Sequence, residues 1–211
     1  SYSNLGYTLL GSLIEKVSEQ DYAAYLNAAV LAPLGMTDSI FAIDPGREPQ
    51  LAVGYRQGKP GAERYFLRDV PAGALFSSAA GMSRFIRVLL ADGQTDTQAL
   101  VRPETLREMW RAQNSDVPLD MDRRVGLGWM LGQTELDYAG PVVHHNGGTL
   151  GAASELMLLP QHKLGVIVLA NSAAGSAALG RIAVQALKLA LEAKTGIPEP
   201  AAPKPVDRVP V

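Results

Sequence analysis

The chain has 211 residues, of which 47% are hydrophobic and 19% are charged, and its formal net charge is −2. This balance is typical of one folded globular domain with a sizeable core, or of part of a larger one, and argues against disorder. No run of Lys or Arg marks a surface that follows phosphates, so we expect no nucleic-acid partner. A small-molecule or peptide substrate fits this composition better.

The absence of cysteine excludes thiol nucleophiles, zinc–thiolate sites and disulfides. It does not discriminate between reducing and oxidising compartments. No stretch approaches the roughly 20 apolar residues of a membrane-spanning helix. We predict no cofactor and no metal site. The adjacent His144 and His145 would point to opposite faces of an extended segment, which makes them poor joint metal ligands.

Two helices are predicted at the beginning of the chain. Apolar residues recur at helical spacing over residues 4–17, and Asn4 has a side chain suited to cap that helix. A second helix should start at about Asp21 and end before Pro33. We expect the first helix to pack against the strands predicted within 152–170, so Leu13→Ala should cost about 2–5 kcal/mol.

The middle of the chain predicts a hairpin and then two further helices. AVGYRQ (52–57) and RYFLR (64–68) would flank the turn GKPG (58–61). Ser77 or Ser78 is placed to cap a helix that continues to about residue 90, and a shorter helix should follow Pro103.

The second half predicts three strands and a closing helix. The strand-like runs are VGLGWML (125–131), ASELMLL (153–159) and LGVIVLA (164–170), with a turn at PQHK (160–163). A helix over 176–193 completes the pattern, which favours an α+β fold with an antiparallel sheet flanked by helices. We assign 1–196 to the domain and 197–211 to a Pro-rich linker or tail.

The common catalytic motifs are absent. The sequence has no Gly-x-Ser-x-Gly, no His-Glu-x-x-His and no phosphate-binding glycine loop. The remaining candidate is HHNGGTLGAAS (144–154), whose glycines would let a ligand approach the backbone and leave N–H groups to point at it. This pattern suits an oxyanion hole or a strand edge that pairs with a substrate peptide. A Gly-rich bend with a histidine that only packs is an equally good interpretation of this stretch alone.

Three motifs together resemble a known family. YSN (2–4), PAGALFSS (71–78) and HNG (145–147) followed by two strands are similar to the serine β-lactamase-like superfamily, which includes class C β-lactamases, D-alanyl-D-alanine carboxypeptidases and related esterases. YSNLGYTLLGSLIEKVS, LAPLGMTDS, VGLGWM and LGVIVLANS occur in the family's order, so the resemblance covers about residues 1–195. It implies a β-lactamase/transpeptidase-like fold that is incomplete in this chain.

The resemblance implies a catalytic role for four residues. Tyr2 would take or relay the nucleophile's proton, which requires nearby positive charge to lower a phenol pKa from about 10. Asn4 would bind the substrate amide or the catalytic lysine. His145 would occupy the cationic position of the third motif, and the Gly148 N–H would be an oxyanion donor. The alternatives are that Tyr2 only packs before the helix and that Asn4 is only its cap.

The resemblance also implies a group of substrate-binding residues. Gly147 would let the strand approach the substrate, and Asn146 and Thr149 would contact it. Asn146 stands where the family usually has Thr, so its contacts are the least defined. A literal KTG occurs at residues 194–196, but its Lys, Gly and following Pro198 are typical of a helix end.

The family's Ser-x-x-Lys nucleophile motif is not in the sequence. No Ser stands three residues before any lysine. We therefore expect the nucleophile in an N-terminal segment or companion chain, and we expect this chain alone to be inactive. Ser1 as an N-terminal nucleophile is a minor alternative.

The whole protein is predicted to be a serine hydrolase of β-lactam, D-Ala-D-Ala peptide or small-ester bonds, in the periplasm or outside the cell. The alternative is a non-catalytic module that binds peptides or cell-wall fragments. The small predicted sheet should have an open edge, which favours a companion segment, a homo-oligomer or a swapped dimer.

Overall fold

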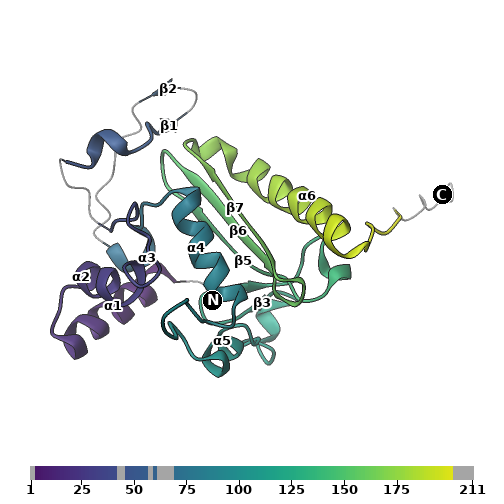
Figure 1. Cartoon of the computed structure of the whole chain (residues 1–211), viewed down its shortest axis with the longest axis horizontal. Coiled ribbons are helices and arrows are strands. Elements are labelled where there is room, and N and C mark those ends of the chain that lie inside the picture. Colours follow the sequence, from purple (N-terminus) through teal and green to yellow (C-terminus); the bar gives the residue numbers. More distant parts are fainter. Residues whose placement is uncertain (1–2, 42–45, 57–58, 61–68, 202–211) are drawn as a thin grey trace.

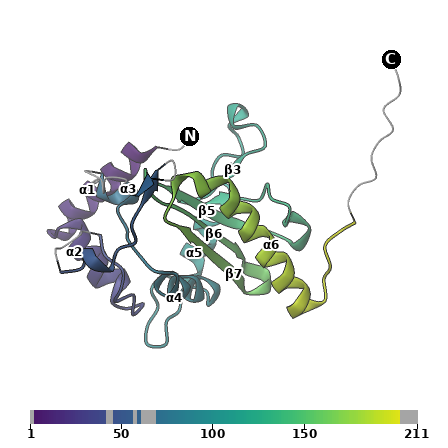
Figure 2. The ribbon, with the colours of Figure 1, turned by 90° about the horizontal axis from the view of Figure 1, so that it is seen from above.

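The computed structural model describes residues 3–41, 46–56, 59–60 and 69–201. In these ranges an antiparallel sheet of five strands has one long helix on one face and two helices on the other. The helices from the beginning of the chain lie to one side of the sheet (Figures 1 and 2). The predicted α+β class, with an antiparallel sheet flanked by helices, is confirmed.

The elements have the following bounds. The sheet contains, in spatial order, β3 (Arg124–Val125), β4 (Met130–Leu131), β5 (Val143–Gly148), β6 (Ala153–Leu159) and β7 (Leu164–Ala170). A separate ribbon pairs β1 (Tyr55–Arg56) with β2 (Lys59–Pro60). The helices are α1 (Asn4–Ser18), α2 (Tyr22–Leu26, continued by the π-helix Asn27–Leu31), α3 (Val70–Gly73), α4 (Ala79–Leu90), α5 (Pro103–Met109) and α6 (Ser176–Thr195).

Strand β6 is buried on both faces, and this determines how the core is divided. Leu156 and Leu158 face α4 and α5, where they pack with Ile86, Leu89, Leu106 and Trp129. Met157 and Leu159 face α6, where they pack with Ala183, Leu187 and Leu191. A strand with two buried faces needs apolar residues at consecutive positions, which explains the run LMLL (156–159). The predicted strands 153–159 and 164–170 are confirmed.

The run VGLGWML is two short strands, so the prediction of one strand is wrong. Val125 pairs with Met130, and the Gly126 N–H donates a hydrogen bond of 2.8 Å to the Trp129 carbonyl oxygen. Gly128 has a φ of +81°, in the left-handed region that glycine adopts without strain. These glycines reverse the chain where its apolar pattern suggested continuation.

The predicted hairpin is also displaced. The structure pairs Tyr55 with Pro60 and Arg56 with Lys59, so two residues that we assigned to the turn form the second strand. The predicted strand RYFLR (64–68) lies outside the described residues.

Helix α1 is capped by Ser3, one residue before the predicted cap Asn4. The Gly6 N–H donates to the Ser3 Oγ over 3.0 Å, which satisfies one of the unpaired donors of the first turn. Asn4 is therefore the first helical residue. The other predicted caps are confirmed, because Asp21 accepts from the Ala24 N–H and Ser78 accepts from the Gly81 N–H.

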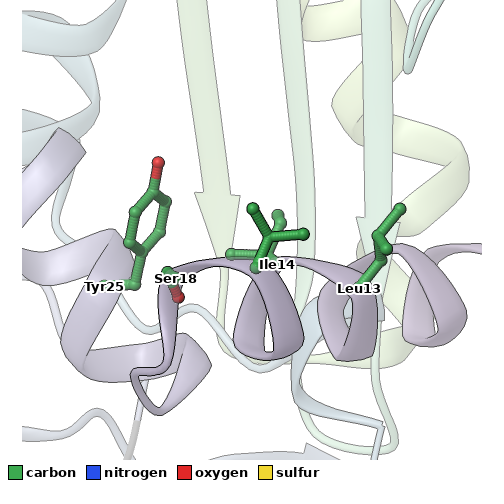
Figure 3. Close-up of a pocket in the computed structure, with 5 residues that line it drawn as sticks. Leu13, Ile14, Ser18 and Tyr25 are labelled. Carbon is green, nitrogen blue, oxygen red and sulfur yellow. The ribbon is translucent and has the colours of Figure 1, made fainter.

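Helix α1 packs mainly against α3 and α2, so the prediction that it docks on the strands is wrong. A Cβ atom at Gly11 would lie less than 3.0 Å from the Pro71 ring, so this glycine permits the close approach of α3. Most of the apolar face is uncovered, and Leu13 is 58% exposed. A hollow of about 220 Å³ is lined by Leu13, Ile14 and Ser18 of α1 and by Tyr25 of α2. Figure 3 labels these four residues.

The literal KTG lies at the end of α6, as predicted. Thr195 is the last helical residue, and Gly196 adopts a φ of +74° as the C-cap. The Pro-rich segment 197–211 stays a predicted linker, although Glu199 within it accepts a hydrogen bond of 2.5 Å from Lys188.

The sheet ends at β7 in the described part of the chain. There β7 pairs with β6 and has no strand on its other side, which agrees with the expected open edge. Within the same ranges, no helix combines the length and apolar character needed to cross a membrane.

The unequal burial of two leucines yields a stability prediction. Leu187 on α6 is 2% exposed in the core, so Leu187→Ala should lower the free energy of unfolding by about 2–5 kcal/mol. Leu13→Ala should change it by no more than about 0.5 kcal/mol, because its side chain is already largely in water. Chemical denaturation of the two variants and the wild type measures both effects. A larger loss for Leu13→Ala would contradict this packing.

A second prediction concerns Lys188, which is 5% exposed on α6. Hydrogen bonds to Glu135 and Glu199 raise the pKa of its ammonium group above the ordinary value of 10.5. A pKa raised by folding stabilises the protonated form, so this contribution is complete below pH 10.5 and is lost as the pH rises through the folded-state pKa. Lys188 should therefore react more slowly than exposed Lys16 with an amine reagent in mildly alkaline buffer. Equal rates by peptide mass mapping would contradict this.

Candidate functional site

Strand β5 carries most of the candidate site, and half of it extends beyond its neighbour β4. β4 pairs only with Val143 and His144, whereas β6 pairs with every residue of β5. Residues 146–148 thus have a strand on one side only, among the described elements. We call this segment the open half of β5.

Two hydrogen bonds establish the direction of the backbone groups in β5. On the β6 side, the Thr149 N–H donates a hydrogen bond of 2.9 Å to the Ala152 carbonyl oxygen. On the β4 side, the Gly132 N–H donates a hydrogen bond of 2.9 Å to the Val142 carbonyl oxygen. In an antiparallel ladder, successive residues direct their N–H and C=O groups to alternate sides. The backbone groups of Asn146 and Gly148 therefore point away from β6, toward the open edge. This is the direction that an oxyanion donor or a substrate-pairing strand requires.

His145 lies beside this edge with its ring oriented by the backbone. Its Nδ1 is 2.6 Å from the Asn146 carbonyl oxygen. Because a carbonyl oxygen only accepts, Nδ1 carries a proton in this contact. The side chain is half-buried, on the same face of the sheet as its ladder partner Leu156. His144 points to the opposite face, as predicted for an extended segment.

The two glycines of the motif have different surroundings. A Cβ atom at Gly147 would lie less than 3.0 Å from the Oγ of Ser154, its ladder partner on β6. Nothing lies within 4 Å of a Cβ placed at Gly148. Gly147 therefore accommodates the neighbouring strand, whereas Gly148 leaves open space next to an outward N–H.

Asn146 and Thr149 occupy exposed positions at the end of β5. Asn146 faces the α6 side, directly opposite Glu155. Thr149 closes the connection to β6 through its bond to Ala152. Both side chains are accessible to a ligand that lies along the open half of β5.

The residues predicted at the beginning of the chain are less completely placed. Tyr2 lies outside the described residues. Asn4 is exposed, and its carbonyl oxygen accepts a hydrogen bond of 3.0 Å from Thr8 Oγ1 within α1. A Cβ at Gly128 would lie 3.2 Å from the Tyr7 hydroxyl, so α1 touches the turn between β3 and β4. The structure thus groups residues 145–149 on one strand end, while Asn4 begins α1 and its predicted role stays a prediction.

Ser154 and Glu155 are neighbours of the site that the sequence did not identify. The Oγ of Ser154 leaves no room for a Cβ at position 147, which explains why a glycine stands there. The pairing of Ser154 with Gly147 follows from the ladder between β5 and β6 once β5 is recognised as a strand. Glu155 is the one acidic residue in the apolar run ASELMLL. In the described ranges, no group of three or more His, Asp or Glu side chains is arranged to hold a metal ion.

Comparison with known proteins gives consistent matches. A model of the Beta-lactamase family matches residues 1–190. The chain is 26% identical over 174 residues to Protein flp of Staphylococcus aureus (strain MRSA252), covering 81% of this chain and 33% of that protein. It is 30% identical over 171 residues to Putative beta-lactamase-like 1 of Homo sapiens, covering 80% of this chain and 33% of that protein.

A solved structure agrees with these matches. The octameric penicillin-binding protein homologue from Pyrococcus abyssi superposes with a TM-score of 0.74 and 28% sequence identity. The match covers 92% of this chain and 44% of that chain. The chain spans about one third of the length of the curated relatives, at 33% of each.

The different surroundings of Gly147 and Gly148 yield a prediction. Gly147→Ala should lower the free energy of unfolding by about 1–3 kcal/mol, because the added methyl overlaps the Ser154 Oγ. Adding Ser154→Ala should restore most of this, since the Ser154 Cβ lies 3.8 Å from the position of the added methyl carbon, an ordinary contact. Gly148→Ala is the matched control and should stay within about 0.5 kcal/mol of wild type. Equal losses for the two single variants, measured by thermal denaturation, would contradict the arrangement.

Proposed function

The chain belongs to the Beta-lactamase family, and from this premise we propose that the protein of which it is part hydrolyses amide or ester bonds through an acyl-serine intermediate. The observation that supports this most directly is the open half of β5, where Asn146 and Gly148 direct backbone groups away from β6. A substrate carbonyl group or an extended peptide would pair with that edge.

In this proposal, each residue of the open half has a distinct role. The Gly148 N–H donates to the oxyanion of the tetrahedral intermediate, and the missing Cβ leaves room for the reacting carbon. The Nδ1–H of His145 is held by the Asn146 carbonyl oxygen, which fixes the ring beside the open half, and the imidazole supplies positive charge there when it is protonated. Asn146 and Thr149 contact the remainder of the substrate.

The nucleophile is proposed to come from outside these 211 residues. No Ser-x-x-Lys occurs in the sequence, and the curated relatives are about three times longer than the matched region, which is 33% of each. Tyr2 would take the nucleophile's proton once that segment is present, and Asn4 would bind the substrate amide or the catalytic lysine.

The proposed substrates are D-Ala-D-Ala-type peptides and small esters in preference to β-lactams. Histidine at position 145 stands where the efficient β-lactamases of the resembled family have lysine, and a neutral imidazole attracts a carboxylate less strongly than an ammonium group does. Cell-wall peptides lie outside the cytoplasm, so a periplasmic or extracellular location is part of the proposal. The open edge of β7 and the octameric homologue support a companion segment or a homo-oligomer.

The first experiment uses the chain as it is. Incubated with a labelled β-lactam or a p-nitrophenyl ester, the purified chain should show no acyl adduct by intact-mass analysis. A covalent mass increase would overturn the proposal that the nucleophile lies elsewhere and would direct attention to Ser1.

The second experiment uses a longer protein that includes the proposed nucleophile-bearing segment. The longer protein should form the acyl adduct and hydrolyse the ester. His145→Gln should lower kcat/KM by at least about 100-fold, as expected for a group that acts on developing charge. His162→Gln is the control, because this histidine hydrogen-bonds to the Ala139 carbonyl oxygen. Full activity in His145→Gln would remove His145 from the mechanism.

The absence of a nucleophile motif also favours a second candidate for the chain alone, a module that binds peptides without cleaving them. The open half of β5 would then bind a peptide by strand addition. Titration with an acyl-D-Ala-D-Ala peptide should shift the NMR amide signals of 146–148. Turnover by the longer protein would favour the hydrolase over this alternative.

A further inference from the structure

Glu155 is a buried carboxylate directly behind the open half of β5. It is 7% exposed and lies on the α6 face of β6, between Asn146 on β5 and Val168 on β7. Apart from the proposed contact of Asn146 with the substrate, the proposed chemistry uses the opposite face and the open edge, and it gives Glu155 no role.

The partner of Glu155 is His144, one residue before the candidate site histidine. His144 Nδ1 lies 3.4 Å from Glu155 Oε1, and both side chains are largely buried. That oxygen is inaccessible to solvent and has no hydrogen-bond partner among the described residues. The contact is an ion pair only while His144 is protonated.

The ladder partners of this pair are apolar or amide side chains, and Tyr138, whose buried hydroxyl has no hydrogen-bond partner among the described residues, packs against the core on the same face of the sheet. Met130 of β4 and Met157 of β6 lie opposite His144, and Val168 of β7 lies opposite Glu155. Leu179 and Ala183 are the buried residues of this part of α6. The cationic side chains of α6 before its last turn are Arg181, which is exposed, and Lys188, which bonds to Glu135 and Glu199.

The position of the open half depends on its contact with β6, because β4 does not reach it. His144 is the last residue of β5 that β4 holds, and Glu155 is the ladder partner of Asn146. An attraction between His144 and Glu155 therefore joins β5 to β6 across the ladder, at the point where the support of β4 ends.

We propose that Glu155 is a positioning residue that, through the imidazolium of His144, holds residues 146–148 against β6, so that the order of the site strand depends on the protonation of His144. When His144 loses its proton, Glu155 remains as a buried charge without a compensating partner, which is costly. The open half of β5 then moves away from β6, so that water or a proton can reach the Glu155 carboxylate. The proposal rests on the geometry of β5 and not on the proposed hydrolysis.

Histidine changes charge between about pH 5 and 8, so the effect is measurable in the chain as it is. As the pH rises through the titration of the His144 ring, the NMR amide signals of 146–148 should move with the same midpoint. The protection factor of Gly147, whose N–H points toward β6, should fall about tenfold, equivalent to about 1.4 kcal/mol. Protection factors correct for the intrinsic pH dependence of exchange.

Three variants separate this coupling from other causes. In Glu155→Gln, the amide signals and the protection against exchange should no longer change with the same midpoint as the His144 ring. In His144→Gln, the amide signals and the protection should lose their pH dependence. In His145→Gln the coupling should persist, which distinguishes His144 from the imidazole that contacts the Asn146 carbonyl oxygen. The ring of His162 should titrate equally in all of them.

Three results would overturn the proposal. The first is a midpoint at 146–148 that differs from that of the His144 ring. The second is coupling that survives in Glu155→Gln, and the third is coupling that disappears in His145→Gln. If Glu155→Gln fails to fold, persistence of the pH dependence in His144→Gln is equally decisive. Failure of the longer protein to hydrolyse substrate would leave these NMR results unaffected, so the two proposals fail independently.

Discussion

The pairing of β5 with β6 is the constraint on which the candidate site depends. Because side chains alternate between the faces of a strand, this one register sends His145 toward α4 and His144 toward α6. A shift of one residue would exchange the two histidines, place Ser154 away from Gly147 and turn the Gly148 N–H from the open edge back toward β6. The identity of the residues in the motif matters only with this register in place.

The register is maintained by a core on both sides of the neighbouring strand. Leu156 and Leu158 are held by α4 and α5, while Met157 and Leu159 are held by α6, so β6 has no free face on which to slide. The open half of β5 is held less firmly than β6. It is paired along one edge only, and its glycines lie opposite the small residues Ser154 and Ala153. A rigid strand beside a less supported one is a reasonable design for a site that must accept a ligand by backbone pairing.

The parts of the fold that were predictable from sequence are those whose signals are local. β6 and β7 were predicted with the bounds that the structure shows, because turn residues delimit two continuous apolar runs. From the residues alone, β5 could be a strand edge or a Gly-rich bend, and the family resemblance favoured the strand, since two histidines and two glycines carry no strand periodicity. The exposed Leu13 shows another limit, because an amphipathic helix indicates that an apolar face exists and not what covers it. The Gly147–Ser154 and His144–Glu155 contacts depend on register, which appears only when strands are paired.

The open space around Gly148 has a practical consequence when combined with the cysteine-free composition. Gly148→Cys would introduce a unique thiol at the open edge of β5 without any background labelling elsewhere in the chain. A fluorophore or spin label attached there would lie beside the outward N–H and report on whatever approaches that edge. The same glycine that leaves room for a ligand thus offers an attachment point for a spectroscopic sensor.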